Sequence, residues 1–375
     1  MKLIKNVRMI TPGKIVRGNI AFTDEIIGIG EEVTVSGQED KEIEGGGKYL
    51  APGFIDIHIH GAGGYDTMDQ APDALNKISE SIIKSGVTSF LPTIMTMPAV
   101  RIREALENVR KARKEGTGGA RVLGANVEGP FISEDYRGAQ NAEYSEKPAP
   151  GLLEDFLDIV KIITVAPESK GSNRLIEFLT EHQVTVAAGH SGATYEEIME
   201  AREWGLSHIT HLFNAMTGLH HRQPGIVGAA LEKEFTCELI TDFIHIHPAV
   251  VRLAIKTKDL KNLILITDQI RAGSMGEGVY ELGGQEVTVQ NGEARLENGD
   301  LAGSVLTLDQ AVRNIMSLEI LNLPEVISMV TLNPAVLLGV DDYLGRLAPG
   351  YRADLVLLNK DLEVEKVFKA GEEVV

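Results

Sequence analysis

The most informative segment of the chain is Pro52-Gly53-Phe54-Ile55-Asp56-Ile57-His58-Ile59-His60-Gly61, which predicts the first strand of the fold and a candidate metal site at its end. Apolar residues lead into two histidines spaced i, i+2, and on a β-strand this spacing places both side chains on the same face. Two imidazoles at one strand end can bind one cation, and imidazole suits zinc or iron. Because His-x-His also occurs by chance in surface or capping pairs, a metal site requires further ligands elsewhere in the chain.

After this segment, apolar strand-like runs alternate with amphipathic helical stretches. The candidate strands are residues 54–58, 87–92, 121–127, 161–165, 184–188, 208–210, 237–241 and 263–267. The candidate helices are residues 72–85, 101–115, 173–181, 195–204 and 248–255. Eight strands that alternate with helices predict an α/β fold, a (β/α)8 TIM-like barrel. The alternative, a doubly wound open sheet, lacks its Gly-x-Gly-x-x-Gly signal after the first strand.

The two ends of the chain differ from this middle part, because both contain short strand-like pieces separated by turns. Gly45-Gly46-Gly47 marks a flexible join after the first of them. Chain ends of like character can pair, so we predict a small β-sandwich domain from residues 1–50 and 342–375, beside a barrel of residues 51–341. The Gly-rich, alternating stretch 276–299 predicts a hairpin insertion after the last barrel strand.

Composition restricts the class of protein. The chain has 375 residues, a net charge of −18 and 43% hydrophobic residues, which is typical of a globular protein with a large core. The acidic balance argues against nucleic-acid binding. Cys237, the single cysteine, lies in an apolar run and is interpreted as a packed core thiol. With no signal-peptide h-region and no apolar run near the ~18 residues of a membrane span, we expect a cytoplasmic protein that binds no membrane.

Side chains that can bind a metal follow the predicted strands. His58 and His60 end the first strand, and the ends of later strands carry Glu128, His190, His211 and Asp268. The carboxyl ends of barrel strands form the mouth where the active sites of such barrels lie. Each residue alone has a structural explanation, as a loop histidine, a helix cap or a solvated turn. Together, at corresponding strand ends, they predict a metal centre.

This ligand set predicts hydrolytic chemistry. Histidine and carboxylate ligands leave a position for water around a divalent ion, which lowers the pKa of that water towards ~7. A neighbouring carboxylate can take a proton from the water and give it to a leaving amine, and Asp268 is the candidate. The predicted reaction is the hydrolysis of amides or related bonds. The ligand types accept zinc, iron, manganese or cobalt.

Other polar residues near these strand ends are candidates for substrate binding. Arg222, in the run His220-His221-Arg222, presents a planar donor fork suited to phosphate or carboxylate, and a structural ion pair is its alternative. Asn214 follows His211, and His245 follows the seventh strand. The backbone donors of Leu301-Ala302-Gly303, which precede a helix, can contact an anion or a sugar hydroxyl. His182 and His208 are interpreted as structural.

Several motifs carry a family resemblance over essentially the whole chain. They are Glu128-Gly129-Pro130-Phe131, Gly189-His190-Ser191, His211-Leu212-Phe213-Asn214-Ala215-Met216, His220-His221-Arg222-Gln223-Pro224-Gly225 and Leu301-Ala302-Gly303-Ser304. With Pro52-Gly53-Phe54-Ile55-Asp56 and Leu347-Ala348-Pro349-Gly350, the chain resembles the N-acetylglucosamine-6-phosphate deacetylases of the amidohydrolase superfamily. The EGPF and HLFNAM motifs are specific to these deacetylases, whereas His-x-His alone marks only the superfamily.

The resemblance implies a homodimer of barrels with terminal β-sandwiches. It implies hydrolysis of a phosphorylated amino sugar, N-acetylglucosamine 6-phosphate, to glucosamine 6-phosphate and acetate, in amino-sugar catabolism and cell-wall recycling. It further implies that Glu128, His190 and His211 hold a divalent metal, zinc or iron, and that Asp268 is the acid/base. Arg222 would serve its own or the neighbouring subunit's site. The substrate-binding positions it implies are Ala139, Gln140, Asn214, Ala215, Arg222, His245, Leu301, Ala302 and Gly303.

The chain departs from part of the family at two places. Some members lack both first-strand histidines and hold one metal, whereas His58 and His60 here allow a second ion bridged through Glu128. Gln140 stands where many members have a histidine that helps to polarise the acetyl carbonyl. Glutamine can donate a hydrogen bond but has no proton to transfer, so we expect a second metal to polarise the carbonyl instead, as a Lewis acid.

Three alternatives remain open. The first is a related deacetylase that acts on N-acetylgalactosamine 6-phosphate, which differs at C4 of the sugar. The second is another amidohydrolase with two metals bridged by a carboxylated lysine, although residues 162–168, at the end of the fourth strand, contain no lysine. The third is a non-catalytic scaffold of the same fold, which would be expected to lose metal ligands.

Overall fold

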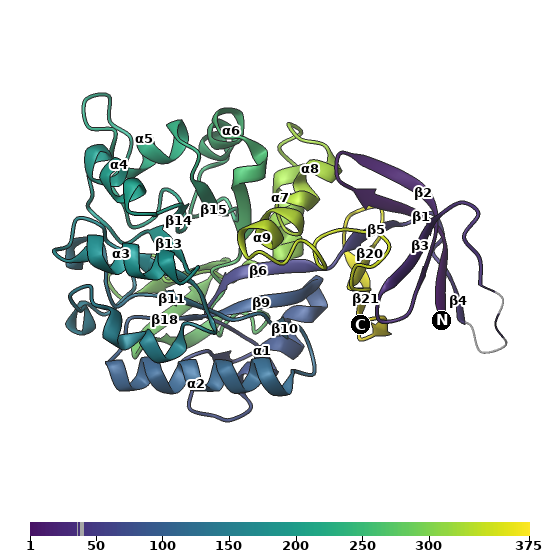
Figure 1. Ribbon diagram of the computed structural model, residues 1–375, viewed down its shortest axis with the longest axis horizontal. Coiled ribbons are helices and arrows are strands. Elements are labelled where there is room, and N and C mark those ends of the chain that lie inside the picture. The colour runs from purple at the N-terminus through teal and green to yellow at the C-terminus, as the bar shows by residue number, and fades with distance from the viewer. Residues whose placement is uncertain (36, 38–40) are drawn as a thin grey trace.

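The computed structural model describes residues 1–35, 37 and 41–375, and a barrel occupies most of this chain (Figure 1). The barrel strands are parallel and follow the order β10-β9-β11-β12-β13-β14-β15-β16, with β6 beside β9. Their bounds are β6 (Phe54–Ile59), β9 (Val87–Ile94), β10 (Arg121–Val122), β11 (Ala125–Glu128), β12 (Val160–Val165), β13 (Thr185–Ala188), β14 (His208–Ile209), β15 (Thr236–Ile240) and β16 (Leu263–Ile266). These strands are almost entirely buried, as expected for a parallel sheet covered on its outer face.

The barrel closes where the chain after β16 meets the end of β6. The backbone N–H of Asp268 donates to the carbonyl of His58 at 2.9 Å, and the N–H of His60 donates to the carbonyl of Gln269 at 2.9 Å. The predicted (β/α)8 TIM-like barrel is therefore confirmed. The predicted strand 121–127 is divided into β10 and β11 at Gly124, where a Cβ atom would lie 2.5 Å from the carbonyl oxygen of Ile159.

Helices cover the outside of the barrel (Figure 1). They are α1 (Ala74–Ile82), α2 (Ala99–Glu115), α3 (Ser172–Glu181), α4 (Tyr195–Glu203), α5 (Gly225–Glu232), α6 (Pro248–Thr257), α7 (Leu308–Met316), α8 (Leu323–Ser328) and α9 (Leu332–Leu337). Short 3-10 turns are η1 (Ile83–Ser85), η2 (Glu134–Tyr136), η3 (Ala142–Tyr144), η4 (Pro150–Leu152), η5 (Glu154–Phe156) and η6 (Leu260–Asn262). Helix α5 was not predicted, because residues 225–231 are all buried and so lack the polar face that produces a helical period.

The predicted hairpin insertion is present as an antiparallel sheet of β17 (Gly278–Leu282), β18 (Gln285–Gln290) and β19 (Glu293–Leu296). A smaller hairpin, β7 (Gly61–Ala62) and β8 (Tyr65–Asp66), follows the first barrel strand. The Gln285 side chain donates to the carbonyl of Ala139 at 2.6 Å. The insertion is therefore fastened to the loop that carries Gln140.

Strands from both chain ends form a second sheet in the order β22-β21-β20-β5-β1-β2-β3, and β4 also pairs with β1. They are β1 (Lys2–Thr11), β2 (Lys14–Phe22), β3 (Ile26–Gly30), β4 (Lys41–Glu44), β5 (Tyr49–Pro52), β20 (Leu355–Leu358), β21 (Val364–Lys369) and β22 (Glu372–Glu373). The rings of Phe22 and Phe368 meet with centroids 5.5 Å apart although their strands are not neighbours, so the sheet curls over its own core, as a sandwich does. The domain limits at residues 50 and 342 stay predictions. Among the described residues, no helix is long and apolar enough to cross a membrane.

Candidate metal centre

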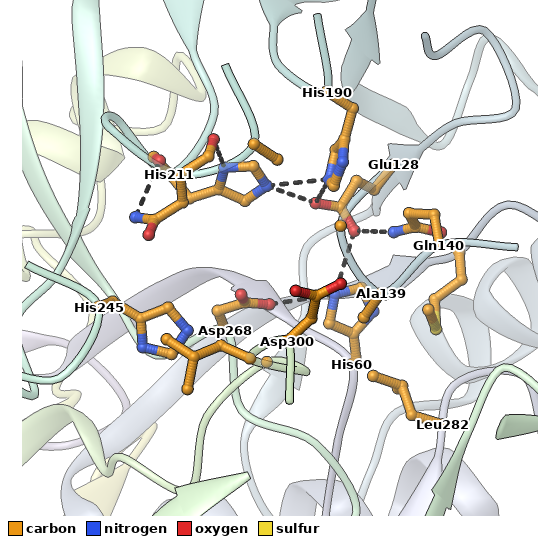
Figure 2. Close-up of a pocket in the computed structure, with 16 residues that line it drawn as sticks. His60, Glu128, Ala139, Gln140, His190, His211, His245, Asp268, Leu282 and Asp300 are labelled. Atoms are coloured by element: carbon orange, nitrogen blue, oxygen red, sulfur yellow. Dashed lines mark hydrogen bonds and ion pairs between the residues drawn. The ribbon is translucent and has the colours of Figure 1, made fainter. Parts of the chain in front are cut away.

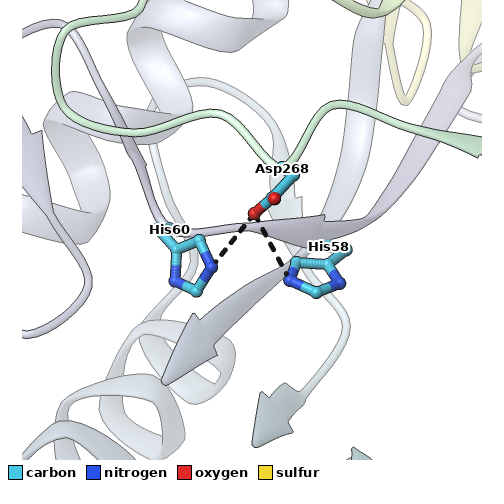
Figure 3. Close-up of side chains that lie close together, drawn as sticks. All are labelled: His58, His60 and Asp268. Atoms are coloured by element: carbon cyan, nitrogen blue, oxygen red, sulfur yellow. Dashed lines mark ion pairs between the residues drawn. The ribbon is translucent and has the colours of Figure 1, made fainter. Parts of the chain in front are cut away.

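The six predicted metal ligands converge at one end of the barrel and form two groups (Figures 2 and 3). The first, called here the Glu128 group, contains Glu128 at the end of β11 with His190 and His211, which follow β13 and β14. The second, the His58 group, contains His58 on β6, His60 just after it and Asp268 after β16. All six residues are buried.

The Glu128 carboxylate lies between the two groups. Its Oε1 is 3.0 Å from His190 Nε2 and 2.9 Å from His211 Nε2, and these two nitrogens are 3.1 Å apart. The same oxygen is 3.4 Å from His58 Nε2. Its Oε2 is 3.2 Å from His60 Nε2. One carboxylate therefore contacts histidines of both groups, three through Oε1 and one through Oε2.

The hydrogen bonds of Nδ1 in His190 and His211, the nitrogen that faces away from Glu128, determine whether Nε2 of the same ring carries a hydrogen or a lone pair. Nδ1 of His190 is 3.0 Å from the carbonyl of Tyr136, and Nδ1 of His211 is 3.2 Å from the carbonyl of Asn214. Because a carbonyl only accepts, each Nδ1 carries the hydrogen, and each neutral ring has a lone pair on Nε2. Two such lone pairs beside a carboxylate oxygen repel one another and favour a cation among them. The Glu128 group therefore fits a divalent metal.

The His58 group has the same character. Oδ1 of Asp268 lies 3.1 Å from His60 Nε2 and 3.5 Å from His58 Nε2 (Figure 3). Nδ1 of His58 is 2.9 Å from Oε2 of Glu238, an acceptor, so this ring also presents a lone pair at Nε2. Nε2 of His58 and Nδ1 of His60 are buried without a hydrogen-bond partner. A buried lone pair aimed at two carboxylates also fits a cation.

Three of the ligands are aimed by an unusual backbone conformation. His190, His211 and Asp268 have positive φ angles of 47°, 29° and 49°. For residues other than glycine this left-handed region costs about 1–3 kcal/mol, and it is found mainly where function requires it. Each of these residues follows the last paired residue of its strand. The chain turns there, so the side chain points across the barrel mouth.

The carboxylates of the site are held in their ionised form. Burial raises the pKa of Glu128, but the surrounding histidines, first His58 and His190, outweigh it and hold this pKa well below its usual range. Burial also raises the pKa of Asp268, and the hydrogen bond from His60 with nearby imidazole charge again lowers it below the usual value. Both groups are therefore available as acceptors at neutral pH.

A cavity opens above the two groups (Figure 2). Most of the predicted substrate-binding residues line it, namely Ala139, Gln140, Asn214, Ala215, His245, Leu301 and Gly303. Ala302 does not, because its side chain is buried behind the cavity and its N–H donates to Ala294. Arg222 does not reach it either. Its exposed side chain bonds to His221 at 2.8 Å and borders a separate hollow beside Tyr136.

Gln140 and His245 are both fixed by hydrogen bonds. Oε1 of Gln140 accepts from the N–H of Thr96 at 2.9 Å, so its Nε2 must face, and donate to, Glu128. Nδ1 of His245 is 2.6 Å from Oδ2 of Asp242. Burial lowers the pKa of His245, but the hydrogen bond and charge of Asp242 outweigh this and raise it above its usual value. Asp242 therefore favours the charged form of His245 at the cavity wall.

Sequence reasoning missed several residues of the site. Met95, Gly138, Leu282 and Asp300 also line the cavity. Met95 directly follows β9 and was passed over because it is apolar. Gly138, Leu282 and Asp300 come from a loop and from the insertion, whose position relative to the strand ends no sequence pattern encodes. Glu238 and Asp242 support the site from behind. The sequence did contain a signal for Glu238. A glutamate within the apolar strand 236–240 is rarely buried without a partner, so its position predicts an interaction with a polar or charged group.

Comparisons with known proteins agree with this geometry. The amidohydrolase family model matches residues 49–374. An N-acetylglucosamine-6-phosphate deacetylase of Lysinibacillus sphaericus is 41% identical, over 88% of this chain and 86% of its own length. An N-acetylgalactosamine-6-phosphate deacetylase of Escherichia coli O157:H7 is 38% identical, over 94% and 93%.

A solved structure has the same fold. It is an N-acetyl-D-glucosamine-6-phosphate deacetylase variant of Mycobacterium smegmatis in complex with N-acetyl-D-glucosamine-6-phosphate. Its TM-score is 0.92 at 31% identity, over 100% of this chain and 99% of that one. The chain therefore belongs to the amidohydrolase family, in the branch of the N-acetylglucosamine-6-phosphate deacetylases.

Proposed function

We propose that this protein hydrolyses N-acetylglucosamine 6-phosphate to glucosamine 6-phosphate and acetate. The observation that carries the proposal is the convergence of the Glu128 and His58 groups on one cavity, in a chain that belongs to this branch of the family. A non-catalytic scaffold would be expected to lose ligands, and all six are present. A divalent ion in such a site acts as a Lewis acid and lowers the pKa of water towards ~7.

The protein's own residues have separate roles in this reaction. The histidines and Glu128 would hold the ion through the lone pairs described above. Asp268, ionised and on the cavity wall, would take a proton from the attacking water at its carboxylate and deliver it to the leaving amine nitrogen. The amide bond then breaks between the acetyl carbon and the sugar nitrogen. Acetate leaves as one product and the free amine as the other.

The sugar phosphate would lie at the side of the cavity that carries His245 and Asn214. His245 is a suitable partner for a phosphate because Asp242 favours its charged form. Gln140, beside Glu128 on another part of the wall, would lie at the acetyl end. Its Nε2 hydrogens are oriented by Thr96, so Gln140 can donate but cannot transfer a proton.

The metal is proposed to be zinc or iron, with one or two ions per subunit. The Glu128 group would hold the first ion, and the His58 group with Glu128 as the bridge would hold the second. We also propose a cytoplasmic homodimer. Arg222 supports it, because this side chain lies outside its own cavity and is exposed, as a residue that serves the neighbouring subunit's site would be.

Acetate release tests the proposal. The measurement compares N-acetylglucosamine 6-phosphate with unphosphorylated N-acetylglucosamine, using protein treated with a chelator and then reloaded with zinc or iron. Metal-dependent release from the phosphorylated sugar only is the expected result. No release from either sugar by the reloaded protein would contradict the proposal.

The epimer, N-acetylgalactosamine 6-phosphate, is a second candidate substrate. The observation in its favour is the 38% identity to the Escherichia coli enzyme named for it. The two sugars differ only in the direction of the C4 hydroxyl. The ratio of kcat/KM for the two phosphorylated sugars decides between them.

A further inference from the structure

Glu238 is a buried acid that the proposed reaction does not use. It lies on β15 (Thr236–Ile240), is fully buried and does not line the cavity. Its carboxylate accepts three hydrogen bonds, from His58 Nδ1 at 2.9 Å, from His208 Nε2 at 3.2 Å and from the backbone N–H of His211 at 2.9 Å. A buried charge requires such partners, but two of these three residues belong to the metal centre.

The contact with His58 determines which nitrogen of that ring is free. An ionised carboxylate can only accept, so the hydrogen of neutral His58 lies on Nδ1 and the lone pair on Nε2. Nε2 is the atom that faces Glu128 at 3.4 Å and Asp268 at 3.5 Å and has no hydrogen-bond partner. In the other tautomer, this atom would carry a hydrogen and could not bind a metal.

The contact between Glu238 and His211 supports the Glu128 group. His211 has a strained φ of 29°, and the bond from its N–H to Glu238 holds the backbone at that point. The backbone carbonyl of Glu238 also accepts a hydrogen bond, at 3.0 Å, from the N–H of Leu212, the residue that follows His211. One residue of β15 therefore contacts a ligand of each group.

We propose that Glu238 is a positioning residue, whose carboxylate fixes the metal-binding tautomer of His58 and the turn that aims His211. The inference rests on the proposed metal-dependent function, but its central claim concerns the metal-free protein. Carboxylates behind metal-binding histidines act in this way in other proteins, and their removal typically lowers metal affinity about 10- to 100-fold.

His208 provides a matched control. It bonds to the same carboxylate, through Oε1, and is buried as completely as His58. Its Nδ1 faces the Thr236 hydroxyl at 2.6 Å, so it belongs to neither metal group. His208→Asn removes one partner of Glu238 and leaves the bonds to His58 and His211 in place.

In the metal-free protein, burial lowers the pKa of His58, but the Glu238 and Glu128 carboxylates outweigh burial and raise this pKa above its usual value. Nitrogen NMR of the histidine rings, recorded at a pH at which the His58 ring is neutral, therefore tests the inference. The His58 signals are identified by their absence in His58→Gln. We expect the Nδ1–H tautomer for His58 in the unchanged protein and in His208→Asn, and its loss in Glu238→Ala. Zinc titration should show affinity about 10- to 100-fold weaker in Glu238→Ala and unchanged in His208→Asn.

Two results would overturn the proposal. One is the Nε2–H tautomer in the unchanged protein, and this measurement suffices if Glu238→Ala does not fold. The other is a folded Glu238→Ala with the same His58 tautomer and zinc affinity as the unchanged protein. Glu238 would then have only a structural role, which would lower the Tm of both Glu238→Ala and His208→Asn. If the protein released no acetate, the proposed function would fail while the tautomer result still stood.

Discussion

The Glu128 group and the His58 group differ in what holds their histidines. In the Glu128 group, the outer nitrogens of His190 and His211 bond to main-chain carbonyls. In the His58 group, His58 bonds to the Glu238 side chain, and Nδ1 of His60 has no partner. A main-chain carbonyl is present whichever residue occupies the position, whereas a side-chain carboxylate is lost by a single substitution.

This difference suggests how one site can hold one ion or two. In the Glu128 group the imidazoles of His190 and His211 are supported by the backbone. The His58 imidazole is supported by a side chain, and substitution of His58 and His60 themselves would remove this group while the backbone contacts of His190 and His211 stay in place. Variants of the ligands themselves test this division.

Glu128→Gln should have the largest effect, because Glu128 is the residue that contacts histidines of both groups. An amide is a weaker, neutral ligand, and its NH2 would replace one of the two oxygens that face the histidines. We expect loss of metal from both groups and a fall in kcat of about 10³-fold or more, or about 4 kcal/mol. Metal analysis and acetate release measure this, and circular dichroism checks the fold. Retention of both ions with substantial activity would contradict the bridging role.

Asp268→Asn should cost nearly as much activity but spare the Glu128 group. Asparagine has the same shape as aspartate but cannot take up a proton, and the loss of a general acid/base typically lowers the rate 10²- to 10⁴-fold. We expect such a fall in kcat with KM little changed. The ion of the Glu128 group should remain, as measured by metal analysis. A variant with nearly full kcat would exclude Asp268 as the proton carrier.

The double variant His58→Ala, His60→Ala tests the His58 group alone. It should reduce the metal content to one ion per chain and lower kcat about 10- to 100-fold, which corresponds to about 1.4–2.7 kcal/mol. The reason is that Gln140 cannot replace a Lewis acid at the acetyl carbonyl. Full activity would refute this coupling.

Gln140→His in the same double-variant background is the matched control. It restores the histidine found in many family members, and we expect it to recover part of the lost kcat without raising the metal content. A kcat no higher than that of the double variant would show that a histidine at position 140 cannot replace the second ion in polarising the acetyl carbonyl.

The sequence predicted the parts of the site that lie on regular strands. His58, His60 and Glu128 lie on strands or directly at their ends, where period-two spacing and barrel topology are sufficient to place a side chain. The barrel itself followed from the alternation of apolar runs and amphipathic helices. The buried helix α5 was missed, because a helix without a polar face has no period to detect.

The supporting contacts could not be predicted in the same way. Glu238 and His58 are separated by 180 positions, and their contact depends on closure of the barrel. The cavity also includes Leu282 and Asp300 from the insertion, whose placement is a matter of tertiary packing. Arg222 was chosen for its chemistry, but the structure places it outside the cavity of its own chain, because loop position is not encoded by residue type.

His245 belongs to neither group, so its effect is expected on KM rather than on kcat or metal content. His245→Asn removes a charged donor from the proposed phosphate position, and a hydrogen bond to a charged group contributes about 1.5–3 kcal/mol. We expect KM for the phosphorylated sugar to rise about 10-fold or more, with metal content unchanged. Equal KM values for the phosphorylated sugar in both proteins would place the phosphate elsewhere.

The pH dependence of this KM gives a sharper test. Because Asp242 raises the pKa of His245 despite burial, the imidazolium is present below that raised pKa and is lost as the pH rises through it. KM should therefore be low below that raised pKa and increase as the pH rises through it. Asp242→Asn removes the charge that raises the pKa, so the increase should begin at lower pH. In His245→Asn the increase should be absent, and its persistence there would show that another group binds the phosphate.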